Sequence, residues 1–124
     1  MPNRQYEAGD RFEKRVMKDL VRRRYIANQT RGSKGAWDIM ALPKLLNPDG
    51  RPNGRRVQMP LLVQVKSGER TVDHNPWNAL YDAARFTLSH ALVADRDGRK
   101  IRYRLITGYH TYRSRDWPAE NYDP

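Results

Sequence analysis

The segment Trp37-Asp38-Ile39-Met40-Ala41-Leu42 constrains the fold most, because an extended chain of this sequence carries apolar side chains on both faces. A strand of this kind has to be covered on both sides of its sheet. Two helices can supply the covering layers. One is predicted from about Tyr6 to Arg24, where apolar residues recur three and four apart, and the other from Asn75-Pro76 to about Thr87.

Short strands complete the predicted architecture. They are expected at Tyr25–Gln29, 61–66, 91–94 and 101–106, with Asp95–Arg99 as a hairpin turn and exposed loops at 30–35 and 47–54. The order helix, strands, helix, strands favours an α/β fold, a sandwich around a small mixed sheet. At 124 residues the chain suits one domain, predicted over 1–110, and the tail 111–124 has no clear element.

The charge indicates a polyanionic partner. The net charge is +10, from 24 Lys and Arg against 14 Asp and Glu. DNA or RNA fits better than a membrane, because the basic segments lack the long Trp/Phe/Leu face that interfacial helices bury in lipid. A basic protein from a thermophile or one associated with ribosomes is the alternative explanation of the charge.

Several classes of protein are excluded by composition. The chain has no cysteine, so disulfides, thiolate catalysis and Cys-ligated zinc are ruled out. No apolar run has the length of a membrane span or a signal-peptide core, and we expect a cytoplasmic protein with no membrane partner and no small-molecule cofactor.

Two acids occupy positions that usually belong to the core. Glu13 falls near the centre of the apolar arc formed by Phe12, Val16 and their neighbours on the first helix, where an ionised carboxylate needs a partner or a cleft. Asp38 interrupts the strand that is apolar on both faces. The structural alternatives are a first-turn acid that stabilises the helix dipole and a turn-capping Asp that faces water.

The strand at 61–66 adds an amide and an amine. Its period of two sends Gln64 and Lys66 to the same face, about 7 Å apart. A bland amphipathic edge strand gives the same pattern. Together with Glu13 and Asp38, however, the two residues form a set that suits phosphodiester hydrolysis. Magnesium prefers oxygen ligands, which Asp38, the Gln64 side chain, the Val65 carbonyl and Glu13 can supply, and manganese is expected to substitute. Lys66 can orient water or stabilise the transition state.

These residues resemble the PD-(D/E)XK nuclease superfamily and, within it, the archaeal-type (Hjc-like) Holliday junction resolvases. The resemblance covers about 9–68 and rests on four motifs: Gly9-Asp10-Arg11-Phe12-Glu13, Arg31-Gly32-Ser33, Asp38-Ile39-Met40-Ala41-Leu42 and Gln64-Val65-Lys66-Ser67. It implies a restriction-endonuclease-like fold, with a central mixed β-sheet flanked by helices. It also implies a magnesium-dependent DNA endonuclease that acts as a homodimer and cuts opposed strands of a four-way junction.

The resemblance also assigns roles to single residues. Glu13 matches the first-helix acid, Asp38 the metal-binding aspartate, Gln64 the third ligand position and Lys66 the catalytic lysine. Gln64 stands where the resolvases usually carry Glu, so metal affinity is expected to be weaker or more dependent on Glu13. Basic and polar residues are expected to contact DNA, chiefly its phosphates; they are Arg22, Arg23, Arg24, Arg31, Ser33, Lys34, Arg55 and Arg56.

Two other functions remain open at this stage. One is a restriction or repair nuclease of the same fold, and the other is a non-catalytic nucleic-acid-binding module in which Gln64 marks a decayed site. The histidines, His74, His90 and His110, lack metal-ligand spacing and are expected at the surface or at an interface. Trp77, Tyr81 and Phe86 are expected in the core or in a dimer contact.

Overall fold

A computed structural model describes residues 4–30, 36–54, 58–66, 72–111 and 117–124. The elements are α1 (Arg4–Arg22), β1 (Tyr25–Gln29), β2 (Ile39–Pro43), β3 (Leu61–Val65), α2 (His74–Phe86), β4 (His90–Asp97), β5 (Lys100–Ile106) and β6 (Ala119–Asn121). This order confirms the predicted α/β class with a central mixed sheet. None of the described helices is long and apolar enough to cross a membrane.

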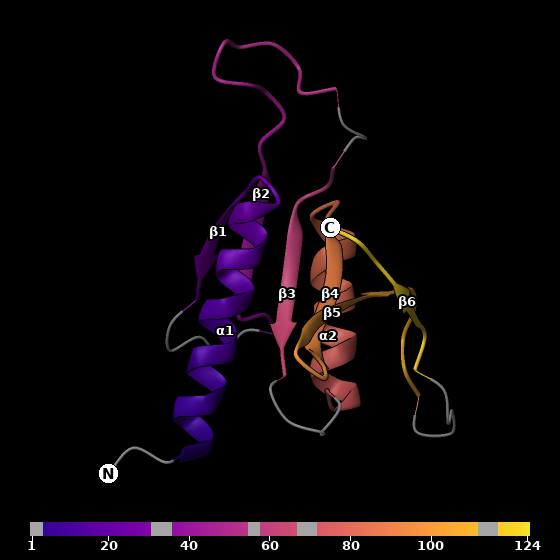
Figure 1. Cartoon of the computed structure of the whole chain (residues 1–124). Helices are drawn as coiled ribbons and strands as arrows, with labels where there is room; N and C mark the ends of the chain where they lie inside the picture. The colour runs from indigo at the N-terminus through magenta and orange to yellow at the C-terminus, as the bar shows by residue number, and fades with distance from the viewer. Residues whose placement is uncertain (1–3, 31–35, 55–57, 67–71, 112–116) are drawn as a thin grey trace.

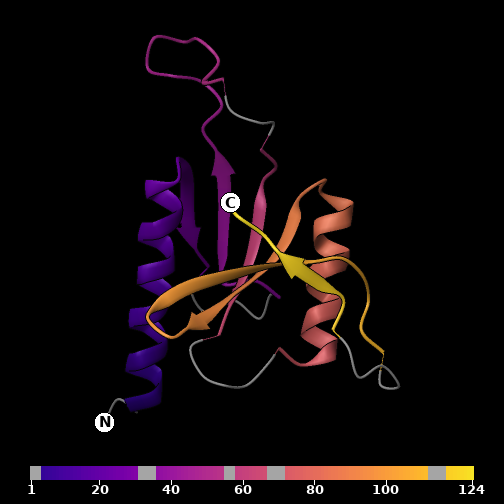
Figure 2. The ribbon, with the colours of Figure 1, turned by 45° about the vertical axis from the view of Figure 1, so that its right-hand side comes forward.

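In the described part of the chain, the sheet contains six strands in sequence order, from β1 to β6. All neighbouring strands are antiparallel except β3 and β4, which run parallel, and α2 makes the crossover between them. The two helices lie on opposite faces of the sheet (Figures 1 and 2). The predicted α/β sandwich is therefore observed, but the expectation that the strand at 37–42 is covered on both faces is wrong, because Met40 and Leu42 are 37% and 47% exposed.

Each face of the sheet has its own core. On one face Phe12, Val16 and Leu20 of α1 are fully buried against Ile39 and Val63. On the other face, α2 packs Trp77, Leu80 and Ala84 against strand residues that include Leu62 and Val93. Alternation along β3 explains the division, because Leu61 and Val63 point to one face and Leu62 points to the other. The expected core position of Trp77 is confirmed.

The hairpin between β4 and β5 differs from its prediction. The strands continue as far as Asp97 and Lys100, so the turn is Gly98-Arg99 rather than Asp95–Arg99. Gly98 has φ 63°, the value that favours glycine at the first position of such a turn. Asp95 belongs to the strand because Arg102, directly opposite, donates two hydrogen bonds of 2.8 and 2.7 Å to its carboxylate. A cross-strand ion pair thus replaces the predicted turn.

The C-terminal segment, which has no clear element in the sequence, continues the sheet. Strand β6 pairs with β5, and Tyr122 packs against the α1-side core and contacts His90 at 3.1 Å. Trp117 packs on Trp77 and stacks on His110, with ring centroids 3.5 Å apart. His110 is 8% exposed, so its predicted surface position is wrong, because the aromatic tail covers it.

For Phe86 the core alternative is wrong, and the dimer-contact alternative stays a prediction. Phe86 lies at the end of α2 with 83% of its surface exposed, and it is therefore no part of the core. Tyr81, one turn earlier, is partly buried and meets Tyr109 edge-on. The side chain of His74, one of the three histidines expected at the surface or at an interface, lies outside the described residues.

Candidate active site

Asp38 stands immediately before β2 and is fixed by its own backbone. Its N–H donates to the Val63 carbonyl at 2.8 Å, and its carbonyl accepts from the Thr30 N–H at 2.9 Å. These bonds extend the pairing of β2 with β3 on one side and with the end of β1 on the other. The carboxylate then turns toward β3, where Oδ2 accepts the Val65 N–H at 2.8 Å. Asp38 is thereby held at the carboxyl end of β3, beside the segment 64–66.

The environment of Asp38 disfavours the charged form of its carboxylate. Burial raises the pKa of Asp38 above its ordinary value, while the Val65 N–H and the positive charge of Lys66 act to lower it. The side chain is half-buried. A partly buried acid whose desolvation outweighs its protein partners is one that a cation can stabilise further.

Glu13 reaches the same region from α1. The Gln29 amide at the end of β1 donates to its Oε1 at 3.1 Å. Burial, followed by the negative charge of Asp38, raises the pKa of Glu13, and the Gln29 hydrogen bond opposes the rise. The two carboxylates predicted from separate segments therefore lie close enough to repel each other. This position excludes the alternative in which Glu13 is a solvated first-turn acid, because α1 begins nine residues earlier, at Arg4.

Gln64 and Lys66 lie at the carboxyl end of β3, on either side of Val65, whose N–H bonds to Asp38. Gln64 is partly buried and lies opposite Val93 of β4. Lys66 lies one residue beyond the strand, and its N–H donates to the Ala94 carbonyl at 2.9 Å, which continues the parallel pairing. Lys66 influences Asp38 electrostatically, so Glu13, Asp38 and Lys66 form one charged group.

The atoms of the candidate active site that could bind a metal ion are oxygen atoms. Among the described residues, no group of three or more His, Asp or Glu side chains could hold a metal ion. The donors that the structure brings together are instead the carboxylates of Glu13 and Asp38 and the carbonyl of Val65, and the Gln64 amide stays a predicted donor. The Val65 N–H points toward Asp38, and the C=O of a strand residue lies on the same side of the strand as its N–H. This set of hard oxygen donors fits magnesium better than a softer metal.

Two residues near the site carry no signal in the sequence. Gln29 positions Glu13, and Thr30 holds the backbone of Trp37 and Asp38 through hydrogen bonds from its hydroxyl of 2.9 and 3.2 Å. Both are unremarkable polar residues at the end of a short strand. Only the pairing of Gln29 with Ile39, which is tertiary information, would have indicated their position.

The cations expected to contact DNA have different surroundings. Arg22 is largely exposed and pairs with Asp19 at 2.6 Å. Arg23 bonds to Asp19 and Asp123 and lies over the Tyr103 ring, so much of its hydrogen-bonding capacity is used within the chain. Arg24 has φ 73° and a buried Nε atom. The remaining residues of this prediction lie outside the described parts of the chain; they are Arg31, Ser33, Lys34, Arg55 and Arg56.

The architecture defines an α/β protein with the fold found in Holliday junction resolvases. The particular structure to which the chain is similar is that of Hjc, a Holliday junction resolvase from the archaeal hyperthermophile Archaeoglobus fulgidus. The TM-score is 0.57 at 24% sequence identity, over 77% of this chain and 70% of Hjc. No family model and no curated protein matches the sequence. The fold implied by the sequence resemblance is thus confirmed, and the activity has to be argued from the site.

Proposed function

We propose that this protein is a metal-dependent endonuclease that resolves four-way DNA junctions by paired phosphodiester hydrolysis. The observation that carries the proposal is the hydrogen bond from the Val65 N–H to Asp38, which holds a desolvated carboxylate at the end of β3. Glu13 and Lys66 lie within electrostatic range of that carboxylate. The name of the similar structure, a Holliday junction resolvase, supports the choice of substrate.

Magnesium is the proposed cofactor, with manganese as a substitute. Asp38 and Glu13 each use one carboxylate oxygen in the hydrogen bonds from Val65 and Gln29, which leaves the other oxygen of each for a cation. The Val65 carbonyl and the Gln64 amide oxygen complete the proposed ligand set. When bound, the metal would lower the pKa of a coordinated water and offset charge on the scissile phosphate.

The protein groups then have distinct roles. Gln29 keeps Glu13 turned toward Asp38, and Val65 fixes the direction of the Asp38 carboxylate. Lys66 supplies a positive charge beside Asp38, where it can contact a phosphate oxygen and stabilise the charge that develops in the transition state. Gln64 supplies an uncharged oxygen, so the site carries one negative charge fewer than a site with three acids.

Paired incision requires two sites, and we propose a homodimer. The support is an apolar area on the sheet face opposite α1. Ile26 and Leu42 are register partners on β1 and β2, and they are 51% and 47% exposed. Met40 beside them is 37% exposed. Apolar side chains gathered on a small protein in this way are typical of a contact surface.

A cleavage assay with labelled four-way junction, flap, duplex and single strand side by side tests the proposal. We expect wild-type protein to cut the junction preferentially in magnesium, with paired nicks. Asp38→Asn and Lys66→Ala should each lower the rate by about 10²-fold or more while junction binding persists. Equal cleavage of duplex or flap would favour a restriction or repair nuclease. Binding without cleavage in magnesium or manganese would favour a non-catalytic module.

A further inference from the structure

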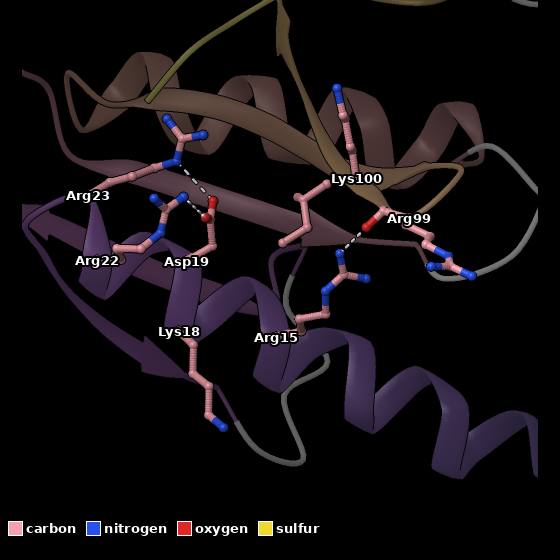
Figure 3. Close-up of a pocket in the computed structure, with 8 residues that line it drawn as sticks. Arg15, Lys18, Asp19, Arg22, Arg23, Arg99 and Lys100 are labelled. Carbon is pink, nitrogen blue, oxygen red and sulfur yellow. Dashed lines mark hydrogen bonds and ion pairs between the residues drawn. The ribbon is translucent and has the colours of Figure 1, made fainter.

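A basic site, separate from the candidate active site, lies on the flank of α1 that faces away from Glu13. An open cavity of about 500 Å³ separates α1 from the hairpin of β4 and β5. Side chains of both elements surround it (Figure 3). Arg15, Lys18, Asp19 and Arg22 come from α1, with Arg23 just after it, and Arg99, Lys100 and Ile101 come from the hairpin.

The cavity carries a large excess of positive charge. Its lining has six Arg or Lys residues and one acid, so the net charge is 6 − 1 = +5. Both oxygens of that acid, Asp19, are already occupied: Arg22 donates to Oδ1, and Arg23 and Tyr103 donate to Oδ2. Although burial opposes it, these hydrogen bonds lower the pKa of Asp19, which stays ionised and paired with Arg22 and Arg23. Among the described residues that line the cavity, the other cations therefore have no second acid to neutralise them.

A hydrogen bond joins the two elements that line the cavity. The Arg15 guanidinium donates to the backbone carbonyl of Arg99, which ties α1 to the turn of the hairpin (Figure 3). The side chains of Arg99 and Lys100 are exposed on the far rim, and no ion pair joins either of them to another described residue. Fixing like charges from two elements around one hollow is unfavourable unless an anion binds between them.

The shape and lining identify the kind of anion. Ile101 is the only apolar residue among the described residues of the lining, which therefore do not form the hydrophobic face that a membrane contact requires. The charge also continues along α1: Arg11, Arg15, Lys18 and Arg22 follow one another at helical spacing over about 16 Å. That length equals the rise of about five nucleotides of one B-DNA strand. An extended polyanion therefore fits better than a small free anion.

We propose that this cavity binds the phosphate backbone of a DNA segment other than the one presented to Glu13, Asp38 and Lys66. Glu13 and Arg15 are two residues apart, or about 200° around the helix axis, so they face opposite flanks of α1. A helix about 10 Å wide thus separates the two sites. The choice of DNA rests on the proposed function, and for a branched substrate the second segment would be another arm of the same junction.

The test compares two double variants of equal charge. Arg99→Gln with Lys100→Gln removes two cations from the cavity, and Lys44→Gln with Arg85→Gln removes two exposed cations elsewhere. Binding to a labelled four-way junction is measured without divalent metal over a range of salt concentrations. We expect the cavity variant to raise the Kd several-fold and to reduce the slope of log K against log salt by about two. The control variant should match wild type, and thermal melts establish that both are folded.

The outcomes separate this proposal from the proposed function. If the cavity variant and the control bind alike, or if both weaken equally, the cavity is no specific DNA contact, even if the wild type cleaves junctions. If the cavity variant alone loses affinity while wild type never cleaves, the second site stands and the nuclease proposal fails.

Discussion

At the scale of single residues, the carboxylates of Glu13 and Asp38 in the candidate site repel each other electrostatically. Both carboxylates are partly desolvated, and the charge of Asp38 contributes to the raised pKa of Glu13. The hydrogen bonds from Gln29 and Val65 satisfy one oxygen of each acid without supplying a positive charge. Such an arrangement lowers the stability of the metal-free protein, and it is a common property of sites that bind a cation.

The first prediction concerns Glu13→Gln. The pKa of Glu13 is raised from 4.5 in the folded protein, so just above that pH the native state binds more protons than the unfolded state. The free energy of unfolding of the wild type therefore falls as the pH rises through this interval. Glu13→Gln has no carboxyl group to titrate and does not show this fall in stability. Its Tm should therefore exceed that of wild type at neutral pH and approach it below pH 4.5.

Magnesium supplies the control for this prediction. Added metal should raise the Tm of wild type, because it binds only the folded state, and it should raise the Tm of Glu13→Gln much less. A variant that is less stable than wild type at neutral pH would show that Glu13 is already well compensated within the chain, contrary to the strained arrangement argued above.

The second prediction concerns Gln64→Glu. This substitution restores the third negative charge that the resolvase-like pattern carries, at the position two residues before Lys66. We expect a several-fold lower magnesium concentration for half-maximal cleavage, since affinity for a hard cation rises with the charge of its ligands. Isothermal titration with manganese gives a readout independent of turnover. Unchanged metal affinity would mean that Gln64 lies outside the ligand set.

At the scale of elements, Asp19 joins the end of α1 to strand β5 on the face of the sheet that α1 covers. The Asp19 carboxylate receives hydrogen bonds from Arg22, Arg23 and the Tyr103 hydroxyl of β5 at 2.6 to 2.9 Å. Tyr103 is 4% exposed. If the Asp19 carboxylate were removed, the Tyr103 hydroxyl would be left without this acceptor in a nearly buried position. The end of α1 therefore depends on a single carboxylate.

The third prediction follows from that dependence. Asp19→Ala should lower the free energy of unfolding by about 1–3 kcal/mol, the cost of a buried donor left unpaired. Asp10→Ala is the matched control, because it removes an exposed pair with Lys14 on the same helix that is worth about 0–1 kcal/mol. Chemical denaturation at neutral pH measures both. Equal losses in the two variants would contradict the role given to Asp19.

Elements with strong local periodicity could be predicted from the sequence, and elements formed by distant partners could not. The apolar spacing of α1 and the alternation of β3 predict a helix and a strand that the structure contains, while the roles given to Glu13, Asp38 and Lys66 stay predictions. Strand β6 has three residues and little local signal, and it exists because β5 offers an edge and Trp117 covers His110. The same reasoning explains Asp95, whose turn-like character yields to the opposed Arg102.

At the scale of the whole molecule, the two sheet faces are covered unequally. Helix α2 packs against β3 and β4, and β1 and β2 expose Ile26, Met40 and Leu42 on the same face. We place the proposed dimer contact on these three residues, because burying them in a second copy would remove apolar surface from water. The cavity beside Arg99 lies on the α1 side and would stay open to DNA.

The fourth prediction tests this placement. Ile26→Asp combined with Leu42→Asp puts two carboxylates in the centre of the contact, and light scattering at micromolar concentration should change from dimer to monomer. Both side chains are exposed in the single chain, so the fold should survive, as circular dichroism can verify. Phe86→Asp is the control, since Phe86 is 83% exposed at the end of α2. If Phe86→Asp alone dissociates the dimer, the contact lies on α2. If wild type is already monomeric, paired incision by a preformed dimer is wrong.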